Sequence, residues 1–371
     1  MTRGPDPARR DLDARVLAWM REPAWRSDDA RFEALALELF AFQWERCQPY
    51  RRFCEGRGVR PATLSRWQEI PAVPTGAFKE LELRSFPAQR SAHVFRTSGT
   101  SSSTRGALHL DTLELYEASL LPSFARHVLP DLALGERAAI LVLAPPPSET
   151  PDSSLSHMFG VLLREFGTPE SGFFLREGVL RSDELLAGLA HASQRGARLA
   201  LCGTAFAFVF LLDELARRGR TLALPSGTRI METGGFKGRS RELGRDALYA
   251  EIEQRLGVPA ARIVNQYGMT EIGSQFYDSV LRLPDEPRRK LGPPWARVKL
   301  VDPLNGGPAP ENEPGAIAIV DLANTGSVLA LQTADLGRRI GAGFDVVGRE
   351  PGAEARGCSI AADELLGQAG T

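Results

Sequence analysis

Residues 97–106 read Thr-Ser-Gly-Thr-Ser-Ser-Ser-Thr-Arg-Gly, and nine of these ten residues are Gly, Ser or Thr. Glycine lets a backbone fold into a concave loop and hydroxyl groups add donors, so the stretch can surround one anion. A short strand pattern at 93–96 precedes it and a helical pattern begins near Asp111. The sequence therefore predicts a phosphate-binding loop between a strand and a helix. It lacks the Gly-Lys-Ser/Thr ending of a Walker A loop, and a flexible Ser-rich turn is the alternative.

A second segment, Tyr-Gly-Met-Thr-Glu at 267–271, follows a short apolar run at 262–266. Other short segments lie in order along the chain: Ser-His-Met-Phe-Gly at 156–160, Glu-Thr-Gly-Gly at 232–235, Thr-Ala-Asp-Leu-Gly at 333–337 and Gly-Arg at 348–349. Together they resemble the adenylate-forming superfamily of acyl-CoA synthetases, peptide-synthetase adenylation domains and luciferases. The resemblance implies that the chain uses ATP and Mg²⁺ to activate a carboxylic acid as an acyl adenylate.

Alternating strand and helix patterns predict an α/β fold. Strand patterns at 139–144, 198–202, 228–231 and 262–265 are separated by helical patterns at 153–166, 205–217 and 243–256. This alternation is typical of a largely parallel sheet that is covered on both faces and binds ligands at the carboxyl ends of its strands. We expect a mainly helical region at 1–92, an α/β nucleotide-binding core at 93–292, a small β subdomain at 293–347 and a hinge-like tail at 348–371.

The end of the sequence differs from the family pattern. Only 22 residues follow Arg349, and no lysine follows Lys299. Relatives that make CoA thioesters carry a C-terminal domain of roughly a hundred residues there, with a catalytic lysine. The resemblance therefore implies the N-terminal domain of an adenylate-forming enzyme, with the large C-terminal domain absent.

Composition limits the class of protein. The 371 residues include 45 basic and 46 acidic side chains, which gives no indication of a nucleic-acid partner. The sequence has no apolar run long enough to span a membrane and no signal-peptide pattern at its start. Its cysteines, at 47, 54, 202 and 358, fit neither a zinc site nor a disulfide framework. We expect free thiols in a cytoplasmic protein.

The resemblance assigns roles around ATP. It implies that the phosphates, adenine and ribose contact Thr97, Ser98, Gly99, Thr100, Ser101, Arg105, Gly234, Gly235, Tyr267 and Asp335. Arg105 stands where the family often has lysine, and its guanidinium suits bidentate phosphate contact. Ser102 replaces a family glycine, which puts the shape of the loop in doubt.

The remaining roles concern the reaction itself. The resemblance implies that Glu271 binds Mg²⁺, that Thr270 donates to the α-phosphate and that Arg349 contacts the ribose or the carboxylate. His157, Gly268 and Met269 are expected on the substrate side. Structural alternatives exist, because Tyr-Gly is common in strand-end turns, an aspartate can cap a turn, an arginine can be solvated and a lone helical histidine is usually structural.

Cys358 stands in Arg-Gly-Cys-Ser at 356–359, where Arg356 can stabilise a thiolate. The chain length and this ending resemble the acyl-protein synthetases of bacterial bioluminescence fatty-acid reductase, to which phenylacetate-CoA ligases are related. That resemblance implies a fatty or other carboxylic acid as substrate and transfer of its acyl group to Cys358. It further implies delivery of the acyl group to a partner such as an acyl reductase.

Two alternatives stay open. The enzyme could hand acyl-AMP directly to CoA or to a carrier-protein thiol, with Cys358 an idle thiol in a frayed tail. A non-catalytic nucleotide-binding subunit is the other alternative, and Arg105 and Ser102 keep it open. Lys79 lies in a further family-like segment to which we assign no role.

Overall fold

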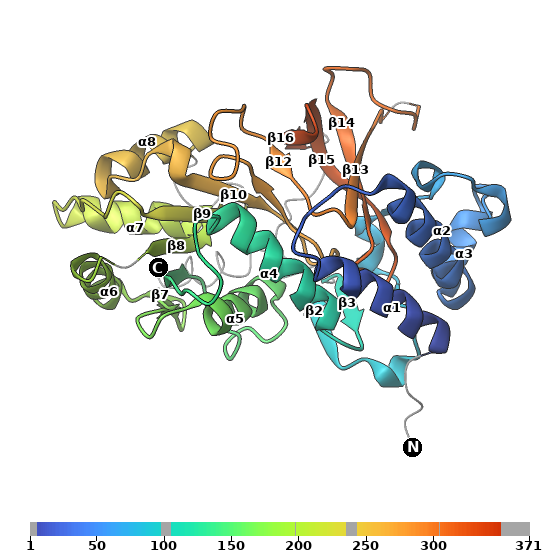
Figure 1. Ribbon diagram of the computed structural model, residues 1–371, viewed down its shortest axis with the longest axis horizontal. Helices are drawn as coiled ribbons and strands as arrows, with labels where there is room; N and C mark the ends of the chain where they lie inside the picture. Colours follow the sequence, from blue (N-terminus) through green and yellow to red (C-terminus); the bar gives the residue numbers. More distant parts are fainter. Residues whose placement is uncertain (1–5, 98–104, 197, 235–242, 304, 350–371) are drawn as a thin grey trace.

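The computed structural model describes residues 6–97, 105–196, 198–234, 243–303 and 305–349. The fold is α/β, as the sequence predicts. A mixed sheet of twelve strands runs through the described residues and is flanked by helices (Figure 1). Figure 1 shows α1 (Pro7–Met20), α2 (Asp29–Arg46) and α3 (Gln48–Glu55) gathered at one end of the molecule, away from α6 and α7.

The parallel part of the sheet matches the predicted alternation. Its strands lie in the order β5-β4-β8-β9-β10, and each pairs in parallel with its neighbours. Their bounds are β4 Ala139–Leu143, β5 Gly172–Phe173, β8 Leu199–Thr204, β9 Arg229–Thr233 and β10 Ile263–Tyr267. Because β4 and β8 are buried along their whole length, their sequences are mostly apolar rather than alternating. Strand β9 is equally buried but includes the polar residues Arg229, Glu232 and Thr233.

Helices cover both faces of this sheet. One hydrophobic cluster includes Ile140 and Val142 with residues of α4 (Glu114–Val128) and α5 (Ser154–Phe166). A second cluster includes the alternate residues Leu141 and Leu143. It packs them against the remaining helices, which are α6 Ser182–Gln194, α7 Ala205–Arg217 and α8 Arg245–Leu256. The sequence patterns predicted α5, α7 and α8 closely and missed α6.

The predicted phosphate loop does not lie directly between a strand and a helix. It connects β2 (His93–Arg96) to β3 (Ala107–Leu110), which pair antiparallel in a separate two-stranded sheet. The helix α4 begins only at Glu114. The prediction of a strand–loop–helix unit was wrong here, because the four residues of β3 form a hairpin with β2 that the sequence pattern did not indicate.

Antiparallel strands continue the sheet beyond β10 in the order β11-β12-β16-β15-β14-β13. Their bounds are β11 Phe276–Asp278, β12 Lys290–Leu291, β13 Ala296–Val301, β14 Gly315–Asp321, β15 Ala330–Ile340 and β16 Gly343–Arg349. Hydrogen bonds thus join β13–β16 to the core strands through β12. Strand β15 is longer than the pattern at 327–333 predicted and begins three residues later. The division of the chain into four regions stays a prediction.

Short elements complete the fold. The strand β1 (Val73–Pro74) pairs in parallel with β15 and so ties the N-terminal region to the sheet. The strands β6 (Leu175–Arg176) and β7 (Val179–Leu180) form a small hairpin. Five 3₁₀ turns are described, at Pro61–Thr63, Trp67–Glu69, Thr75–Lys79, Ala88–Arg90 and Ala260–Arg262. Lys79 ends the third of them.

Candidate active site

Two of the predicted segments lie side by side at the carboxyl ends of β9 and β10. Thr233 ends β9, and its Oγ1 donates a hydrogen bond to the carbonyl of Gln266 in β10 at 3.1 Å. The next residue, Gly234, has a φ of 92°, which is a conformation that favours glycine. Any other residue at position 234 would strain this turn. The backbone conformation therefore explains the glycine, in addition to its predicted role at adenine.

The two ends of the predicted phosphate loop meet at Thr97 and Gly106. The Thr97 amide donates to the Gly106 carbonyl at 2.8 Å, and the Gly106 amide donates to Thr97 Oγ1 at 2.8 Å. Thr97 is buried. This pair fixes where the chain leaves β2 and where it returns to β3. The other predicted contacts of the loop, Ser98, Gly99, Thr100 and Ser101, lie outside the described residues, as do Ser102, Gly235 and Cys358.

Arg105 is engaged at the base of the same loop. Its Nε donates to the Thr97 carbonyl at 2.7 Å, and its Nη1 lies 2.7 Å from a carboxylate oxygen of Asp152. Asp152 also accepts, through its backbone carbonyl, the amide of Arg96 at 2.8 Å. The guanidinium therefore lies beside the loop, as predicted, but its charge is shared with a carboxylate that the sequence did not indicate.

The 267–271 segment lies against this base. Thr270 Oγ1 is 3.5 Å from the carbonyl of Arg96, although the two residues are 174 positions apart in the sequence. Thr270 and Glu271 are both buried, at 3% and 4% exposure. The structure thus brings the segment that follows β10 to the start of the predicted phosphate loop.

Glu271 fits the role of a ligand to a metal ion carried by phosphates. Among the residues that the structure describes, no three His, Cys, Asp or Glu side chains are close enough to hold a metal ion by themselves. Mg²⁺ at a nucleotide is usually held by one or two carboxylates together with phosphate oxygens and water. A single buried carboxylate next to the predicted phosphate loop would therefore be a sufficient protein contribution.

Tyr267, Asp335 and Arg349 form one connected group. The Tyr267 hydroxyl donates to Asp335 Oδ2 at 2.9 Å, and Arg349 Nε donates to Asp335 Oδ1 at 2.6 Å. Asp335 in β15 and Arg349 in β16 are direct cross-strand partners. Burial, and then the Asp335 carboxylate, raise the pKa of Tyr267 well above its usual value, so the hydroxyl stays protonated and keeps donating.

The aromatic ring of Tyr267 is held by neighbours. Phe344 in β16 contacts it edge-on, with ring centroids 5.9 Å apart, and Phe276 in β11 lies 6.3 Å away. These contacts and the hydroxyl bond fix the ring at the strand end. The positions of Tyr267, Asp335 and Arg349 suit the roles that the resemblance implied for adenine and ribose, although each oxygen of Asp335 already accepts a hydrogen bond from the protein.

His157 lies in α5, close to β2. Its Nε2 is 3.0 Å from Glu117 Oε1 in α4, and its ring is tilted against Phe95 and Tyr116 at 5.5 and 5.9 Å. Burial lowers the pKa of His157, although Glu117 acts in the opposite direction. The histidine therefore has structural partners of its own, while its neighbour Phe95 is one residue from Arg96 at the loop base.

Gly268 and Met269 connect β10 to Thr270, and both are partly buried. A Cβ added at Gly268 would lie 2.5 Å from Nε2 of Gln266, which is the far end of a flexible side chain. Met269 packs at the edge of the large hydrophobic cluster. Their positions between Tyr267 and Thr270 place them at the site, and their contact with substrate stays a prediction.

The sequence did not indicate a buried polar group that includes Lys290, Asp278 and Asn265 of β10. Lys290 Nζ donates to Asp278 and, at 3.2 Å, to the carbonyl of Asn265. Burial alone would raise the pKa of Asp278, but Lys290 and Arg288 hold it below its usual value. Asn265 Nδ2 in turn donates to Glu232 at 2.7 Å, and burial raises the pKa of that carboxyl. A lysine in a short strand gave no signal that it would be buried.

The sequence analysis also missed two side chains that hold the turn after Glu271. They are Asp321, the last residue of β14, and Asn324 in the loop that follows, and both are buried. The available signal was an aspartate and an asparagine directly after an apolar strand pattern, which is where polar ligands and turn-forming residues concentrate.

Three of the four cysteines are described, and all three are buried. Burial raises the pKa of Cys54 and of Cys202 to about 12 and also raises that of Cys47. Thiols of this kind are poor nucleophiles at neutral pH because the thiolate is the reactive form. The expectation of free thiols is confirmed for these three cysteines.

No helix within the described parts of the chain combines the length and the apolar composition that crossing a bilayer demands.

Comparisons with known proteins agree with this geometry. The model of the family described as "Acyl-protein synthetase, LuxE" matches residues 10–367. The long-chain-fatty-acid–luciferin-component ligase of Aliivibrio fischeri is 22% identical over 313 residues, which cover 82% of this chain and 78% of that protein.

Solved structures show the same fold. A 2-hydroxyisobutyryl-CoA ligase in complex with 2-HIB-AMP and CoA superposes with a TM-score of 0.61 at 15% identity, over 86% of this chain and 75% of that one. ATP-bound MatB from Rhodopseudomonas palustris gives a TM-score of 0.50 at 19% identity, over 71% of this chain and 49% of that one. The fold is that of adenylate-forming ligases.

Proposed function

The chain belongs to the LuxE family of acyl-protein synthetases and is an adenylate-forming ligase of the acid–thiol kind, and on this premise we propose that it activates a fatty acid with ATP and transfers the acyl group to its own Cys358. The observation that carries the proposal is the meeting of the end of β10 with the base of the loop at 97–106, through Thr270 and Arg96. The ligase named for a long-chain fatty acid supports the class of acid.

In the first step, a carboxylate oxygen of the acid forms a bond to the α-phosphorus of ATP. The bond from that phosphorus to the bridging oxygen breaks, and pyrophosphate leaves. Two negatively charged groups must approach each other, so positioning and charge neutralisation supply most of the catalysis. In this proposal Thr97 and Arg105 contact the phosphates at the loop base, Thr270 donates to the α-phosphate, and Asp335 orients the ribose.

Glu271 is the residue that would hold Mg²⁺ against the phosphates. When bound there, Mg²⁺ supplies positive charge that offsets the phosphate charge during the attack. The carboxylate lies among buried residues at the end of β10, so few water molecules compete for it.

In the second step, the thiolate of Cys358 forms a bond to the acyl carbon, the bond from that carbon to AMP breaks, and AMP leaves. The proton of the thiol goes to solvent. The raised pKa of Cys47, Cys54 and Cys202 supports Cys358 as the acceptor, because a thiol attacks an acyl adenylate as its thiolate. We further propose that the acyl thioester is then delivered to a partner, such as an acyl reductase.

Exchange of labelled pyrophosphate into ATP tests the first step. The purified protein is incubated with ATP, Mg²⁺ and labelled pyrophosphate, together with fatty acids of increasing chain length or with aromatic acids. We expect exchange that depends on the added acid and is fastest with a long-chain fatty acid. No exchange with any acid would contradict adenylation and favour a non-catalytic nucleotide-binding subunit, whereas formation of acyl-CoA without labelled protein would favour direct transfer to CoA.

A further inference from the structure

We propose that Asn324 is a positioning residue for Glu271, and that Gln43 of the N-terminal region extends this support from the opposite side. The inference rests on the proposed function, in which Glu271 is the metal ligand. Asn324 lies in the loop at 322–329, between β14 and β15, more than fifty residues from Glu271 in the sequence. No other role in the proposed reaction is assigned to it.

The carboxamide of Asn324 uses both of its ends on the turn that carries Glu271. Its Nδ2 donates to the carbonyl of Glu271 at 2.8 Å, and its Oδ1 accepts the amide of Gly273 at 2.8 Å. A second hydrogen from Nδ2 goes to the carbonyl of Val328 at 3.2 Å. Because Asn324 is buried, water cannot readily replace these bonds if the side chain is lost.

Asp321, the residue that directly precedes this loop, holds the next residue of the turn. Asp321 accepts the amide of Ser274 at 2.8 Å and the hydroxyl of Ser274 at 2.7 Å, and it also accepts the amide of Ala323 at 3.0 Å. Asp321 and Ser274 are fully buried. Asn324 and Asp321 therefore hold the turn by hydrogen bonds to Glu271, Gly273 and Ser274. These bonds set the direction in which the chain continues after β10.

The fit between the loop and the turn depends on Gly273. A Cβ at this position would lie 2.8 Å from Cβ of Ala323. Gly273, Ala323 and Asn324 also line a cavity of about 10 Å³, which has room for about one water molecule. Packing therefore does not fill the space around the turn completely, and the hydrogen bonds of Asn324 and Asp321 determine its position.

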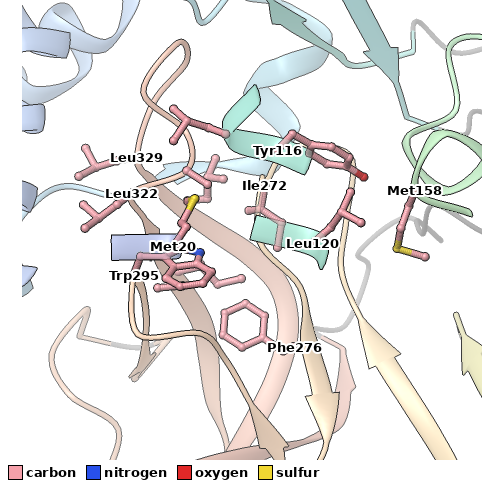
Figure 2. Packing of buried hydrophobic residues seen from close by; sticks show 14 of the residues in the cluster. Met20, Tyr116, Leu120, Met158, Ile272, Phe276, Trp295, Leu322 and Leu329 are labelled. Carbon is pink, nitrogen blue, oxygen red and sulfur yellow. The ribbon is translucent and has the colours of Figure 1, made fainter. Parts of the chain in front are cut away.

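Apolar contacts anchor the two segments in one cluster. Figure 2 shows Ile272 of the turn beside Tyr116 and Leu120 of α4, in the same cluster as Leu322 and Leu329 from the two ends of the loop. These side chains hold the loop near the turn, whereas the hydrogen bonds of Asn324 act on the backbone at Glu271 and Gly273. The directional part of the support comes from the hydrogen bonds.

Gln43 connects this support to α2. Its Nε2 donates to the carbonyl of Asn324 at 2.8 Å, and its Oε1 accepts the amide of Leu329 at 2.8 Å. Gln43 is fully buried. A continuous path of hydrogen bonds thus runs from the N-terminal helices through Gln43 and Asn324 to the backbone of Glu271. The N-terminal region therefore contributes to the geometry of the site through Gln43.

Asn324→Asp tests the inference because it keeps the shape of the side chain and the acceptor for Gly273 but removes the donor to Glu271. The matched control is Asn305→Asp, in an exposed turn. Like Asn324, Asn305 accepts a hydrogen bond from a glycine amide through Oδ1, here from Gly307 at 2.7 Å, and donates through Nδ2. We would measure the dissociation constant of Mn²⁺ from the enzyme–ATP complex by the EPR signal of free Mn²⁺. No acid is present, so the measurement is independent of turnover.

We expect Asn324→Asp to raise the Mn²⁺ dissociation constant about tenfold, which corresponds to one lost hydrogen bond at a buried site, and Asn305→Asp to leave it unchanged. Asn324→Ala removes the same bond without adding a buried charge and should give the same shift. The dissociation constants are measured at a temperature at which thermal unfolding shows that all three variants are folded.

Three results would overturn the inference. The first is unchanged Mn²⁺ affinity in both Asn324 variants. If only the melting temperature falls, the role of Asn324 is merely structural. Failure of both variants to fold would also overturn the inference, since the loop would then determine folding rather than position Glu271. Glu271→Gln separates this from the proposed function: if that variant also binds Mn²⁺ normally, the metal role of Glu271 fails, and with it the premise.

Discussion

At the scale of single residues, the candidate site contains two acidic residues that other groups hold in place, one through its carboxylate and one through its backbone. Asp335 accepts hydrogen bonds from Tyr267 and Arg349, while the backbone around Glu271 is held by Asn324. A carboxylate with fixed orientation loses little freedom when a ribose or a metal ion binds, so its interactions are available to the reaction. Each of these carboxylates can be tested by removing its charge and keeping its size.

We predict that Glu271→Gln slows acid-dependent pyrophosphate exchange by about 10²-fold or more, because the variant loses a charged ligand that neutralises the phosphates during attack. The measurement is the exchange rate at saturating ATP. Glu311→Gln, in the exposed turn between β13 and β14, is the matched control and should exchange like the wild type. Normal exchange in Glu271→Gln would remove this residue from the metal role.

Asp335→Asn should raise the KM for ATP about tenfold, because hydrogen bonds to a charged acceptor contribute about 1.5–3 kcal/mol. Asp345→Asn provides the control, since Asp345 also pairs with an arginine, Arg245, at 3.2 Å in a more exposed position where ion pairs contribute little. Steady-state kinetics at varied ATP would distinguish the two. Equal KM values for both variants would indicate that Asp335 only stabilises β15 against β16.

At the scale of elements, α4 and β11 meet at a buried histidine. The ring of His127 stacks on Tyr277 with centroids 5.5 Å apart, and its Nδ1 contacts the Ser123 carbonyl at 2.9 Å. Burial lowers the pKa of His127 to about 4, and the positive charges of Arg282 and Arg126 add to this effect. The histidine is thus neutral in the fold, whereas in the unfolded chain it takes a proton near its ordinary pKa.

The free energy of unfolding should therefore fall as the pH is lowered from about 6.5 to about 4, because only the unfolded state binds a proton in that window. The contribution of His127 is at most about 3 kcal/mol. His127→Phe should flatten this pH dependence, while the partly exposed His191→Gln should not. Denaturant unfolding at several pH values measures this pH dependence. If the free energy of unfolding of His127→Phe changes with pH as in the wild type, His127 is not the group responsible.

The junction of β12 with β16 should tolerate no side chain at Gly343. A Cβ there would lie 2.3 Å from the carbonyl of Lys290, which is backbone and cannot turn aside. Gly343→Ala should destabilise the protein by about 1–3 kcal/mol and raise the KM for ATP, because the neighbouring Phe344 contacts Tyr267. Gly172→Ala in β5, where a Cβ meets open space, is the control. Equal melting temperatures in the two variants would show that β12 and β16 can separate without cost.

The sequence predicted the parallel half of the sheet well because local patterns determine it. The helices α5 and α7 begin where Ser153 and Thr204 cap them, and apolar runs mark the buried strands. Patterns failed where strands are very short or where the contact is not local. The hairpin of β2 and β3 has strands of only four residues, and the support of Glu271 by Asn324 joins segments 53 positions apart. Motif residues could be found from the sequence, but the groups that hold them could not.

At the scale of the whole molecule, the twelve-stranded sheet carries the adenine and ribose part of the candidate site, while the base of the loop at 97–106 lies in the separate sheet of β2 and β3. Strands β9 and β10 present the turns around Gly234 and Tyr267, while β15 and β16 of the same sheet present Asp335 and Arg349. The N-terminal helices reach the site through Gln43. Adenylation in our proposal depends on this assembled sheet, whereas acyl transfer depends in addition on Cys358. The two half-reactions should therefore separate when that thiol is removed.

The most direct test of the account is covalent labelling of the wild type and of Cys358→Ala with a radiolabelled long-chain fatty acid, ATP and Mg²⁺, followed on a denaturing gel. The account predicts labelled wild-type protein whose label neutral hydroxylamine removes, as expected for a thioester. It predicts no label on Cys358→Ala, although that variant keeps its pyrophosphate exchange, and both activities in the buried-cysteine control Cys202→Ala. Hydroxylamine-sensitive label on Cys358→Ala would contradict the account, because another cysteine would then be the acceptor.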